Sequence, residues 1–172
     1  HNVYNALAAC AVGRELGISP AECARALAGY PPAGMRQKVV RRSGYTVVED
    51  CYNASPDSMR AALQTLAAWP GVSRRIAVLA DMLELGRLEE AAHLEIGRLA
   101  AQLGVDLVLA YGPAARLYVQ GAEGAGGQAR HFGTKAALLQ ALQGTLRPGD
   151  VVWFKGSHSM ALEEVLEGLY TA

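Results

Sequence analysis

The chain has 172 residues, and its 16 Lys and Arg balance 16 Asp and Glu, so its formal net charge is zero. Hydrophobic residues make up 51% of it, which is enough for a folded core and argues against disorder. A neutral chain has no electrostatic attraction for nucleic acid or an anionic membrane surface. No apolar run approaches the roughly 18–20 residues of a membrane span. We therefore expect a folded protein with no nucleic-acid partner and no membrane span.

The cysteines and histidines do not form a recognisable cluster. Cys10, Cys23 and Cys51 are odd in number and form no CxxC pair, which favours reduced thiols over a disulfide scaffold. The four histidines are scattered, so we expect no metal site. The opening residues, His1 and Asn2, lack the basic start and apolar stretch of a secretory signal. We expect a cytoplasmic protein.

Two short helices are predicted first. Residues 3–16 are rich in Ala and are followed by Gly17, and residues 19–22 (Ser-Pro-Ala-Glu) form a capping box for a helix that ends near Ala28. The Tyr-Pro-Pro-Ala-Gly stretch at residues 30–34 is a strong breaker. Two helices are too few for an independent core, so we interpret residues 1–33 as the tail of a domain whose body is missing, and residues 34–172 as a separate domain.

After residue 34, strands alternate with helices. Two β-branched runs separated by Ser43-Gly44 predict a hairpin. Short apolar runs then alternate with amphipathic segments, which predicts an α/β domain with a mostly parallel sheet and helices on both faces. The predicted strands are residues 37–42, 45–50, 76–80, 107–110, 130–132 and 151–154. Three predicted helices begin near residues 56, 89 and 114, and two more carry the apolar residues 138, 139 and 142 and the apolar residues 162, 165, 166 and 169. The Gly-rich residues 121–127 lack GxGxxG spacing, and we interpret them as a surface loop rather than a phosphate cradle.

Ligands of such sheets collect at the carboxyl ends of the strands, and one informative stretch lies there. Asp50 ends a predicted strand and could hold ribose hydroxyls, and the helix start behind it could face an anion. The alternative is that Ser55 only caps the helix and Asp57 only complements its dipole. That alternative does not explain Tyr52-Asn53 in the turn.

Two further strand ends carry polar groups. Asp81 and Glu84 follow one strand and could serve acid–base work or a metal, or could be solvated loop charges. Lys155-Gly156-Ser157-His158 follows the most apolar strand and suits a carboxylate or phosphate. The rival interpretation makes Ser157 or Ser159 a helix cap and directs Lys155 at the nucleotide.

Asn2 and Asn5 lie three residues apart, so they share a helix face, and amides can both donate to and accept from an adenine edge. The alternative is that Asn2 caps the helix and Asn5 faces solvent.

Taken in order, these motifs resemble the Mur ligase family along the whole chain. Glu49, Ser55, Ala80 and His158 stand where the family usually has Asp, Asn, Gly and Arg. The motifs that carry the resemblance are Asn2 and Asn5, Gly34-Met35-Arg36, residues 50–59 (Asp-Cys-Tyr-Asn-Ala-Ser-Pro-Asp-Ser-Met), residues 81–86 (Asp-Met-Leu-Glu-Leu-Gly) with His93, and Lys155-Gly156-Ser157.

The resemblance implies an ATP-dependent ligase whose Rossmann-like last domain closes over ATP and brings the incoming amino acid or dipeptide. It implies that residues 1–33 belong to the central ATPase domain, and that ATP and Mg²⁺ serve the full-length enzyme. No GxxxxGK[ST] occurs in the sequence, so the missing amino-terminal and central domains would supply the P-loop and the Mg²⁺ ligands, and this chain alone would be inactive. The nucleotide-binding residues implied are Asn2, Asn5, Arg36, Asp50, Tyr52 and Asn53.

Residues 52–56, Tyr-Asn-Ala-Ser-Pro, indicate the member of the family that joins D-alanyl-D-alanine to UDP-N-acetylmuramoyl-tripeptide. Lys155, Ser157 and His158 would then bind the dipeptide. A sister ligase that adds lysine or diaminopimelate resembles Tyr-Ala-His-Thr-Pro there and carries a later Asp-Asn-Pro-Arg, which this sequence lacks. A non-catalytic nucleotide-binding module is the alternative from another class.

Overall fold

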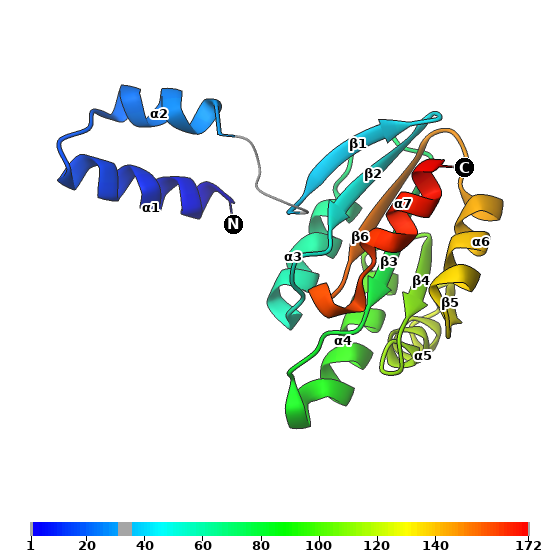
Figure 1. The fold of residues 1–172 in the computed structure, drawn as a ribbon. Coiled ribbons are helices and arrows are strands. Elements are labelled where there is room, and N and C mark those ends of the chain that lie inside the picture. Colours follow the sequence, from blue (N-terminus) through cyan, green and yellow to red (C-terminus); the bar gives the residue numbers. More distant parts are fainter. Residues whose placement is uncertain (1, 31–35, 172) are drawn as a thin grey trace. The chain divides into compact units, whose positions relative to one another are not determined.

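The computed structural model describes residues 2–30 and 36–171, and its contacts divide the chain into two compact units, His1–Ala33 and Gly34–Ala172. Helix α1 (Asn2–Glu15) and helix α2 (Pro20–Ala28) form the first unit (Figure 1). The predicted capping box is confirmed, because Ser19 accepts from the backbone of Glu22 and the Glu22 side chain accepts from the backbone of Ser19. Of the predicted breaker at residues 30–34, Tyr30 is described and exposed, and residues 31–34 lie outside the described residues, as do His1 and Met35.

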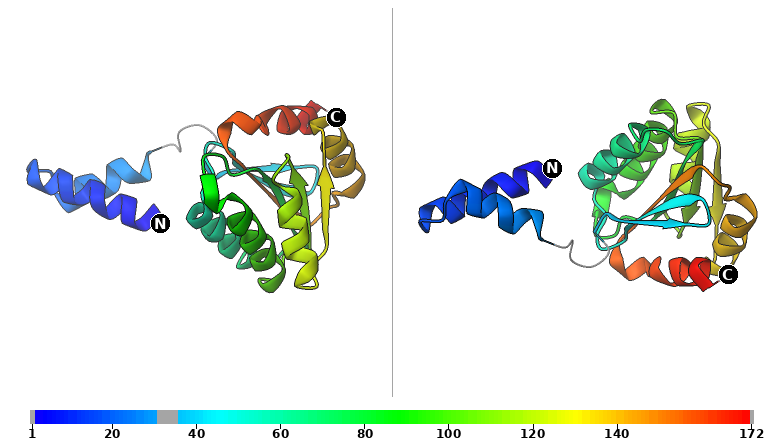
Figure 2. Two further views of the ribbon diagram at one scale, coloured as in Figure 1. Left: turned by 90° about the horizontal axis from the view of Figure 1, so that it is seen from below. Right: turned by 90° about the horizontal axis from the view of Figure 1, so that it is seen from above.

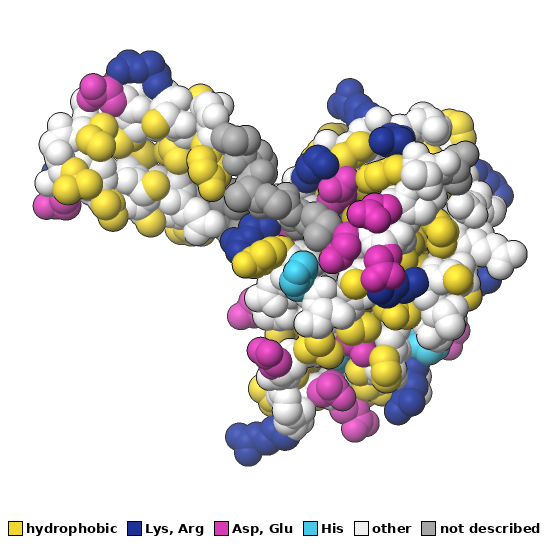
Figure 3. Space-filling model, in the orientation of Figure 1, with side chains coloured by type: hydrophobic (Ala, Val, Ile, Leu, Met, Phe, Trp, Pro, Cys, Tyr) yellow, Lys and Arg dark blue, Asp and Glu magenta, His cyan; other side chains and the backbone are white. Residues whose placement is uncertain are grey.

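The first unit exposes much of its apolar surface. Hydrophobic side chains are spread over its visible face in Figure 3, and Val3, Tyr4 and Leu16 are each more than 70% exposed. Among the described residues of this unit, Cys23 is the hydrophobic side chain that is buried. These helices therefore have apolar surface but no substantial core of their own.

The second unit is built on a six-stranded sheet with the order β1-β2-β6-β3-β4-β5 (Figure 1). Strand β1 pairs antiparallel with β2, and the other neighbours are parallel. The predicted mostly parallel sheet is confirmed. The strands are β1 (Lys38–Arg42), β2 (Tyr45–Asp50), β3 (Arg74–Ala80), β4 (Leu107–Tyr111), β5 (Ala129–Phe132) and β6 (Asp150–Lys155).

The predicted hairpin joins β1 to β2. Arg42 pairs with Tyr45 across a two-residue turn, and both turn residues have positive φ, 46° at Ser43 and 84° at Gly44. A type I′ turn requires positive φ at both central positions, and its twist matches that of the strands. This turn sets the register in which Lys38 lies opposite Glu49.

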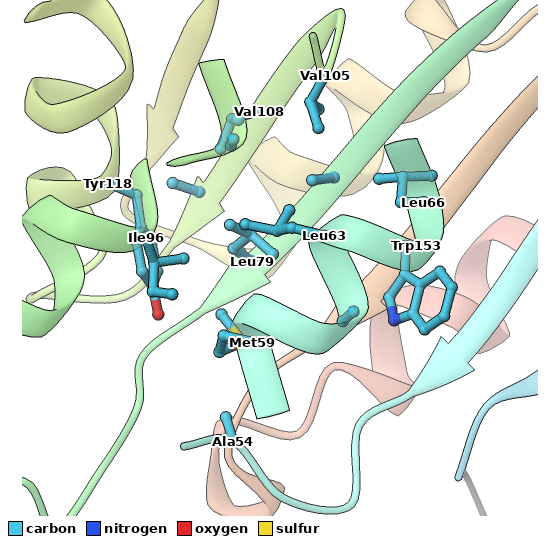
Figure 4. Packing of buried hydrophobic residues seen from close by; sticks show 14 of the residues in the cluster. Ala54, Met59, Leu63, Leu66, Leu79, Ile96, Val105, Val108, Tyr118 and Trp153 are labelled. Atoms are coloured by element: carbon cyan, nitrogen blue, oxygen red, sulfur yellow. The ribbon is translucent and has the colours of Figure 1, made fainter. Parts of the chain in front are cut away.

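Helices cover both faces of the sheet, as predicted (Figure 2). Helices α3, α4 and α5 pack on one face, where Met59, Leu63 and Leu66 of α3 face Leu79 and Trp153 of the strands (Figure 4). Helices α6 and α7 pack on the other face, against alternate residues of the same strands. The helices are α3 (Pro56–Ala67), α4 (Glu89–Gln102), α5 (Arg116–Gly124), α6 (Lys135–Thr145) and α7 (Glu163–Thr171).

The predicted Gly-rich loop at residues 121–127 is partly wrong. Residues 121–124 belong to α5, and Gly121 is buried. A Cβ at this position would overlap with the carbonyl oxygen of Leu94 on α4. Gly121 therefore allows α4 and α5 to approach closely. A glycine in the sequence can serve either a close helix contact or a flexible loop, and composition alone does not tell the two apart. No helix within residues 2–30 and 36–171 is long and apolar enough to cross a bilayer.

Candidate functional site

Three strands of the sheet end beside one another and bring the predicted polar motifs together. In the parallel register Asp50, the last residue of β2, lies opposite Lys155, the last residue of β6, and Leu79 of β3 lies opposite Lys155 from the other side. The motifs that follow these strands are therefore neighbours at one edge of the sheet, although about a hundred residues separate Asp50 from Lys155 in the chain.

A buried ion pair joins two of these strand ends. Lys155 Nζ lies 2.8 Å from Asp50 Oδ2 and also donates to the carbonyl oxygen of Asn53 at 3.0 Å. Trp153 Nε1 donates to the same Asp50 oxygen at 3.4 Å. Asp50 and Lys155 are 7% and 3% exposed, so both charges are largely removed from water and depend on each other. The predicted nucleotide residue Asp50 and the predicted dipeptide residue Lys155 are thus in direct contact.

An exposed aromatic and basic cluster lies next to this pair. The Arg36 guanidinium lies 4.0 Å from the centroid of the Tyr52 ring, a cation–π arrangement. The His158 ring lies 5.9 Å from the same ring, and His158 Nδ1 lies 3.9 Å from Glu163 Oε1. The cluster therefore joins the predicted nucleotide residues Arg36 and Tyr52 to the predicted dipeptide residue His158.

The turn between β2 and α3 is held by its own side chains. Asn53 is exposed, and its Oδ1 accepts from the backbone N–H of Ala54 at 2.9 Å. Ser55 caps α3 by accepting from the backbone N–H of Ser58, and Asp57 pairs with Arg60 at 2.9 Å. The predicted local role of Ser55 is confirmed, and the cap presents the amino-terminal end of α3 behind Asp50.

Ser157 joins the β6 loop to the loop that follows β3. Its backbone N–H donates to the carbonyl oxygen of Asp81 at 3.1 Å, and its Oγ accepts from the backbone N–H of Leu83 at 2.9 Å. Its side chain makes no capping hydrogen bond to the short 3₁₀ helix His158–Met160, so the alternative of Ser157 as a helix cap is wrong. Ser159 is exposed within that short helix.

Asp81 and Glu84 have different environments. Glu84 is exposed. Asp81 is buried, its Oδ2 accepts from the backbone N–H of Ala114 at 3.2 Å, and its Oδ1 has no hydrogen-bond partner. Burial raises the pKa of the Asp81 carboxyl, while the backbone N–H groups of Ala114 and Ala115 act in the lowering direction. The Asp81 side chain thus links the loop after β3 to the loop after β4.

His93 on α4 is a functional candidate to which the sequence motifs assigned no role. It is fully buried, and its Nε2 lies 3.1 Å from the backbone N of Met82 in the loop after β3. Its Nδ1 lies 2.7 Å from the carbonyl oxygen of Glu89, and its ring packs on Tyr118 with centroids 4.6 Å apart. A single His on an apolar helix face predicts a core residue, and only the fold reveals the contact with Met82.

The remaining predicted residues lie in the first unit. Helix α1 begins at Asn2, and Asn5 is exposed on it. Within the described residues, no three side chains of His, Cys, Asp or Glu are grouped where they could hold a metal ion. At the sheet edge the Asp50 carboxylate is already paired with Lys155, and the Asp81 carboxylate accepts from the backbone N–H of Ala114.

Fold and site together define a doubly wound α/β domain that presents charged and aromatic side chains at the carboxyl ends of its central strands, the place where open α/β sheets bind ligands. Residues 35–158 match the family model described as Mur ligase, glutamate ligase domain. The chain belongs to the Mur ligase family.

Individual proteins of this family are similar to the chain in sequence and in structure. The chain is similar to the UDP-N-acetylmuramoyl-tripeptide–D-alanyl-D-alanine ligase of Bacillus subtilis (strain 168), with 40% identity over 172 residues, covering 98% of this chain and 38% of that protein. A crystal structure of MurF from Acinetobacter baumannii matches with a TM-score of 0.87 and 31% identity, covering 100% of this chain and 38% of that one. The MurF ligase of Thermotoga maritima in complex with ADP matches with a TM-score of 0.78 and 26% identity, covering 94% and 36%. This chain spans less than two fifths of these relatives' length.

Proposed function

We propose that this chain is the carboxy-terminal part of an ATP-dependent ligase that joins D-alanyl-D-alanine to UDP-N-acetylmuramoyl-tripeptide in the cytoplasm. The relative from Bacillus subtilis carries the name of that activity. The observation that carries the proposal is the meeting of three strand-end motifs, at Asp50, Asp81 and Lys155, at one edge of the sheet. Residues 1–33 are proposed as the end of the central ATPase domain and residues 34–172 as the last domain.

The proposed reaction has two steps. The terminal carboxylate of the tripeptide attacks the γ-phosphoryl group of ATP, forming an acyl phosphate and releasing ADP. The amine of D-alanyl-D-alanine then attacks the acyl carbon, an amide bond forms, and inorganic phosphate and a proton leave. Holding the three reactants in one site supplies the proximity that the amine attack needs.

Six residues are proposed on the nucleotide side: Asn2, Asn5, Arg36, Asp50, Tyr52 and Asn53. Lys155 and Trp153 both donate to Oδ2 of Asp50, and in the proposal Oδ1 accepts from a ribose hydroxyl. Asn53 uses its Oδ1 within the turn, so its NH₂ group is the proposed donor. Arg36, exposed and stacked on Tyr52, is proposed to reach the phosphates.

Lys155, Ser157 and His158 were expected to bind the dipeptide, and their contacts differ. Lys155 Nζ is buried between Asp50 and Asn53, which supports the rival role on the nucleotide side, exerted through Asp50. Ser157 Oγ accepts from Leu83, so its own O–H can donate to the dipeptide carboxylate. His158 has a side chain that is 63% exposed and is proposed beside the carboxylate.

Mg²⁺ would neutralise the charge that develops on the transferred phosphoryl group. Because the Asp50 carboxylate at the sheet edge is already paired with Lys155, we propose that the Mg²⁺ ligands, like the P-loop, lie in the rest of the full-length protein. The chain alone is then expected to have no ligase activity.

The test is a ligation assay of the full-length protein with D-alanyl-D-alanine, lysine and diaminopimelate as separate acceptors. We expect product with D-alanyl-D-alanine alone. Product with lysine or diaminopimelate would favour a sister ligase, and no product with any acceptor, despite nucleotide binding, would favour a non-catalytic module. Asp50→Ala is expected to lower kcat/KM about ten- to a hundredfold at a temperature where the variant is still folded, because a hydrogen bond to a charged group is lost. Its melting temperature should also fall, because Lys155 loses its buried partner. Wild-type kinetics in this variant would remove Asp50 from the site.

A further inference from the structure

We infer that His93 is a positioning residue for the acceptor site: it holds the loop after β3 in the conformation that orients the Ser157 hydroxyl. The inference rests on the proposed role of Ser157 in binding the acceptor carboxylate. It assigns a task to a buried side chain on α4 that does not itself reach the edge of the sheet.

The two hydrogen bonds of His93 define its protonation state. A carbonyl oxygen can only accept, so the 2.7 Å contact with Glu89 requires a proton on Nδ1. The backbone N–H of Met82 can only donate, so the 3.1 Å contact requires an unprotonated Nε2. His93 is therefore the neutral Nδ1–H tautomer, and its lone acceptor atom is committed to the loop.

Met82 is the first link between His93 and the acceptor site. It is fully buried, and the next residue, Leu83, donates its backbone N–H to Ser157 Oγ at 2.9 Å. On the other side of Met82, the carbonyl oxygen of Asp81 accepts from the Ser157 backbone N–H. The peptide group that His93 holds thus lies between the two backbone groups that hold Ser157.

This arrangement fixes the direction of the Ser157 hydroxyl. Because Leu83 occupies one acceptor position of Oγ, the O–H proton must point elsewhere, and it is available to a bound anion. Loss of the His93 acceptor would remove the 3.1 Å hydrogen bond of the buried Met82 N–H, and the loop would move to recover a partner of equal geometry. Leu83 would then release Ser157 Oγ.

The packing around His93 fixes its ring. The ring lies against Tyr118, whose hydroxyl donates to the carbonyl oxygen of Ala80 at 3.1 Å, directly before the loop. Tyr118 bonds to the end of β3 through its hydroxyl, and His93 bonds to the Met82 N–H of the loop through Nε2. This difference allows the acceptor role to be separated from packing.

The experiment compares variants of the full-length enzyme. His93→Phe keeps a ring against Tyr118 and removes both nitrogens, whereas His93→Gln can place an amide oxygen near the position of Nε2. Ile96→Val, a change in the buried face of the same helix, controls for lost packing. Ser157→Ala tests the site on which the inference rests. The Michaelis constants for D-alanyl-D-alanine and for ATP are measured for each.

We expect His93→Phe to raise the KM for D-alanyl-D-alanine about tenfold or more, since one buried hydrogen bond is left unmade, and to change the KM for ATP less than about twofold. His93→Gln should recover most of the effect, and Ile96→Val should change neither constant. In the 172-residue chain, ¹⁵N chemical shifts should show His93 with a protonated Nδ1 and an unprotonated Nε2.

Three results overturn the inference in different ways. If Ser157→Ala raises the dipeptide KM but His93→Phe does not, or raises both constants equally, His93 is only a core residue and the proposed function stands. If Ser157→Ala leaves the dipeptide KM unchanged, the proposed acceptor site itself is wrong, and the role of His93 falls with it. An Nε2–H tautomer would also overturn the inference.

Discussion

At the scale of single residues, the Asp50–Lys155 ion pair is buried on both sides, and its loss should strongly affect the stability of the domain. Each charge is buried against the other, so removing one leaves a charge without its partner. We expect Lys155→Met to lower the free energy of unfolding by about 3–5 kcal/mol. The double variant Asp50→Asn, Lys155→Met should lose less than the sum of the two single variants.

Tryptophan fluorescence during urea unfolding measures this coupling, because both tryptophans, Trp69 and Trp153, lie in the second unit. Strict additivity of the two changes would contradict the pairing. Lys155→Met also distinguishes its two proposed roles in the full-length enzyme. A raised KM for ATP supports action through Asp50, and a raised KM for the dipeptide alone supports direct binding of the acceptor.

The Asp81 carboxyl gives a pH dependence whose direction can be stated. Burial raises its pKa in the folded state, and in the unfolded chain the pKa is about 3.9. Between these two values the folded state holds more protons than the unfolded state, so stability falls as the pH rises through this interval. Asp81→Asn carries no titrating proton and should lack this fall.

The measurement is urea unfolding of wild type and Asp81→Asn at a series of pH values from about 4 to 7. The difference in unfolding free energy between the two proteins should shift in favour of Asp81→Asn as the pH rises. A difference that is independent of pH would show that Asp81 titrates alike in the folded and unfolded states.

At the scale of elements, helices α4 and α5 approach each other through glycines. A Cβ at Gly97 would overlap with the carbonyl oxygen of Tyr118, and one at Gly121 with that of Leu94. We expect Gly97→Ala and Gly121→Ala each to destabilise the domain by about 1–3 kcal/mol or more through overpacking. This exceeds the gain of about 1 kcal/mol that alanine brings in a helix.

Gly124→Ala provides the matched control in α5, because no atom lies within 4 Å of the added Cβ. It should be neutral or slightly stabilising. Denaturant midpoints of the three variants measure the contrast. Equal midpoints for Gly121→Ala and Gly124→Ala would mean that the two helices can move apart at little cost.

The positions of the helices and strands follow from local sequence patterns, whereas the order of the strands in the sheet does not. The β-branched run of β2, the apolar run of β3 and the apolar stripes of the helices predict the secondary structure, because each pattern lies within one segment. The insertion of β6 between β2 and β3 depends on contacts between distant segments. For this reason Asp50 and Lys155 were assigned to two different ligands before their contact was known.

The site residues show the same division. Ser55 as a helix cap is a local property, and the sequence predicted it. The contacts of Ser157 with Asp81 and Leu83, and of His93 with Met82, cross between segments and have no sequence signal of their own. Sequence therefore identified candidate groups at the strand ends but not the hydrogen bonds that orient them.

At the scale of the whole molecule, the acidic helix α7 limits where anions can bind. Acidic side chains gather over α7 in Figure 3, and the helix carries Glu163, Glu164 and Glu167. Their negative charge disfavours a phosphate on that face. Arg36, whose guanidinium stacks on Tyr52 after β2, offers an exposed positive charge instead, in keeping with the proposed nucleotide site beside β2.

The absence of a P-loop motif from the sequence predicts how the chain by itself responds to ATP. A P-loop surrounds phosphates with backbone N–H groups and positions Mg²⁺, and the sequence contains no GxxxxGK[ST]. Asp50, Tyr52 and Arg36 would contribute a few exposed hydrogen bonds and a cation–π stack, which is too little to order a triphosphate. We therefore expect titration calorimetry of the 172-residue chain with ATP and Mg²⁺ to give no binding in the micromolar range.

The full-length protein, measured in the same buffer, should bind ATP, and Asp50→Ala should weaken that binding about tenfold or more. A micromolar dissociation constant for the chain alone would mean that this domain carries its own phosphate site and that the division of labour proposed between the domains is wrong.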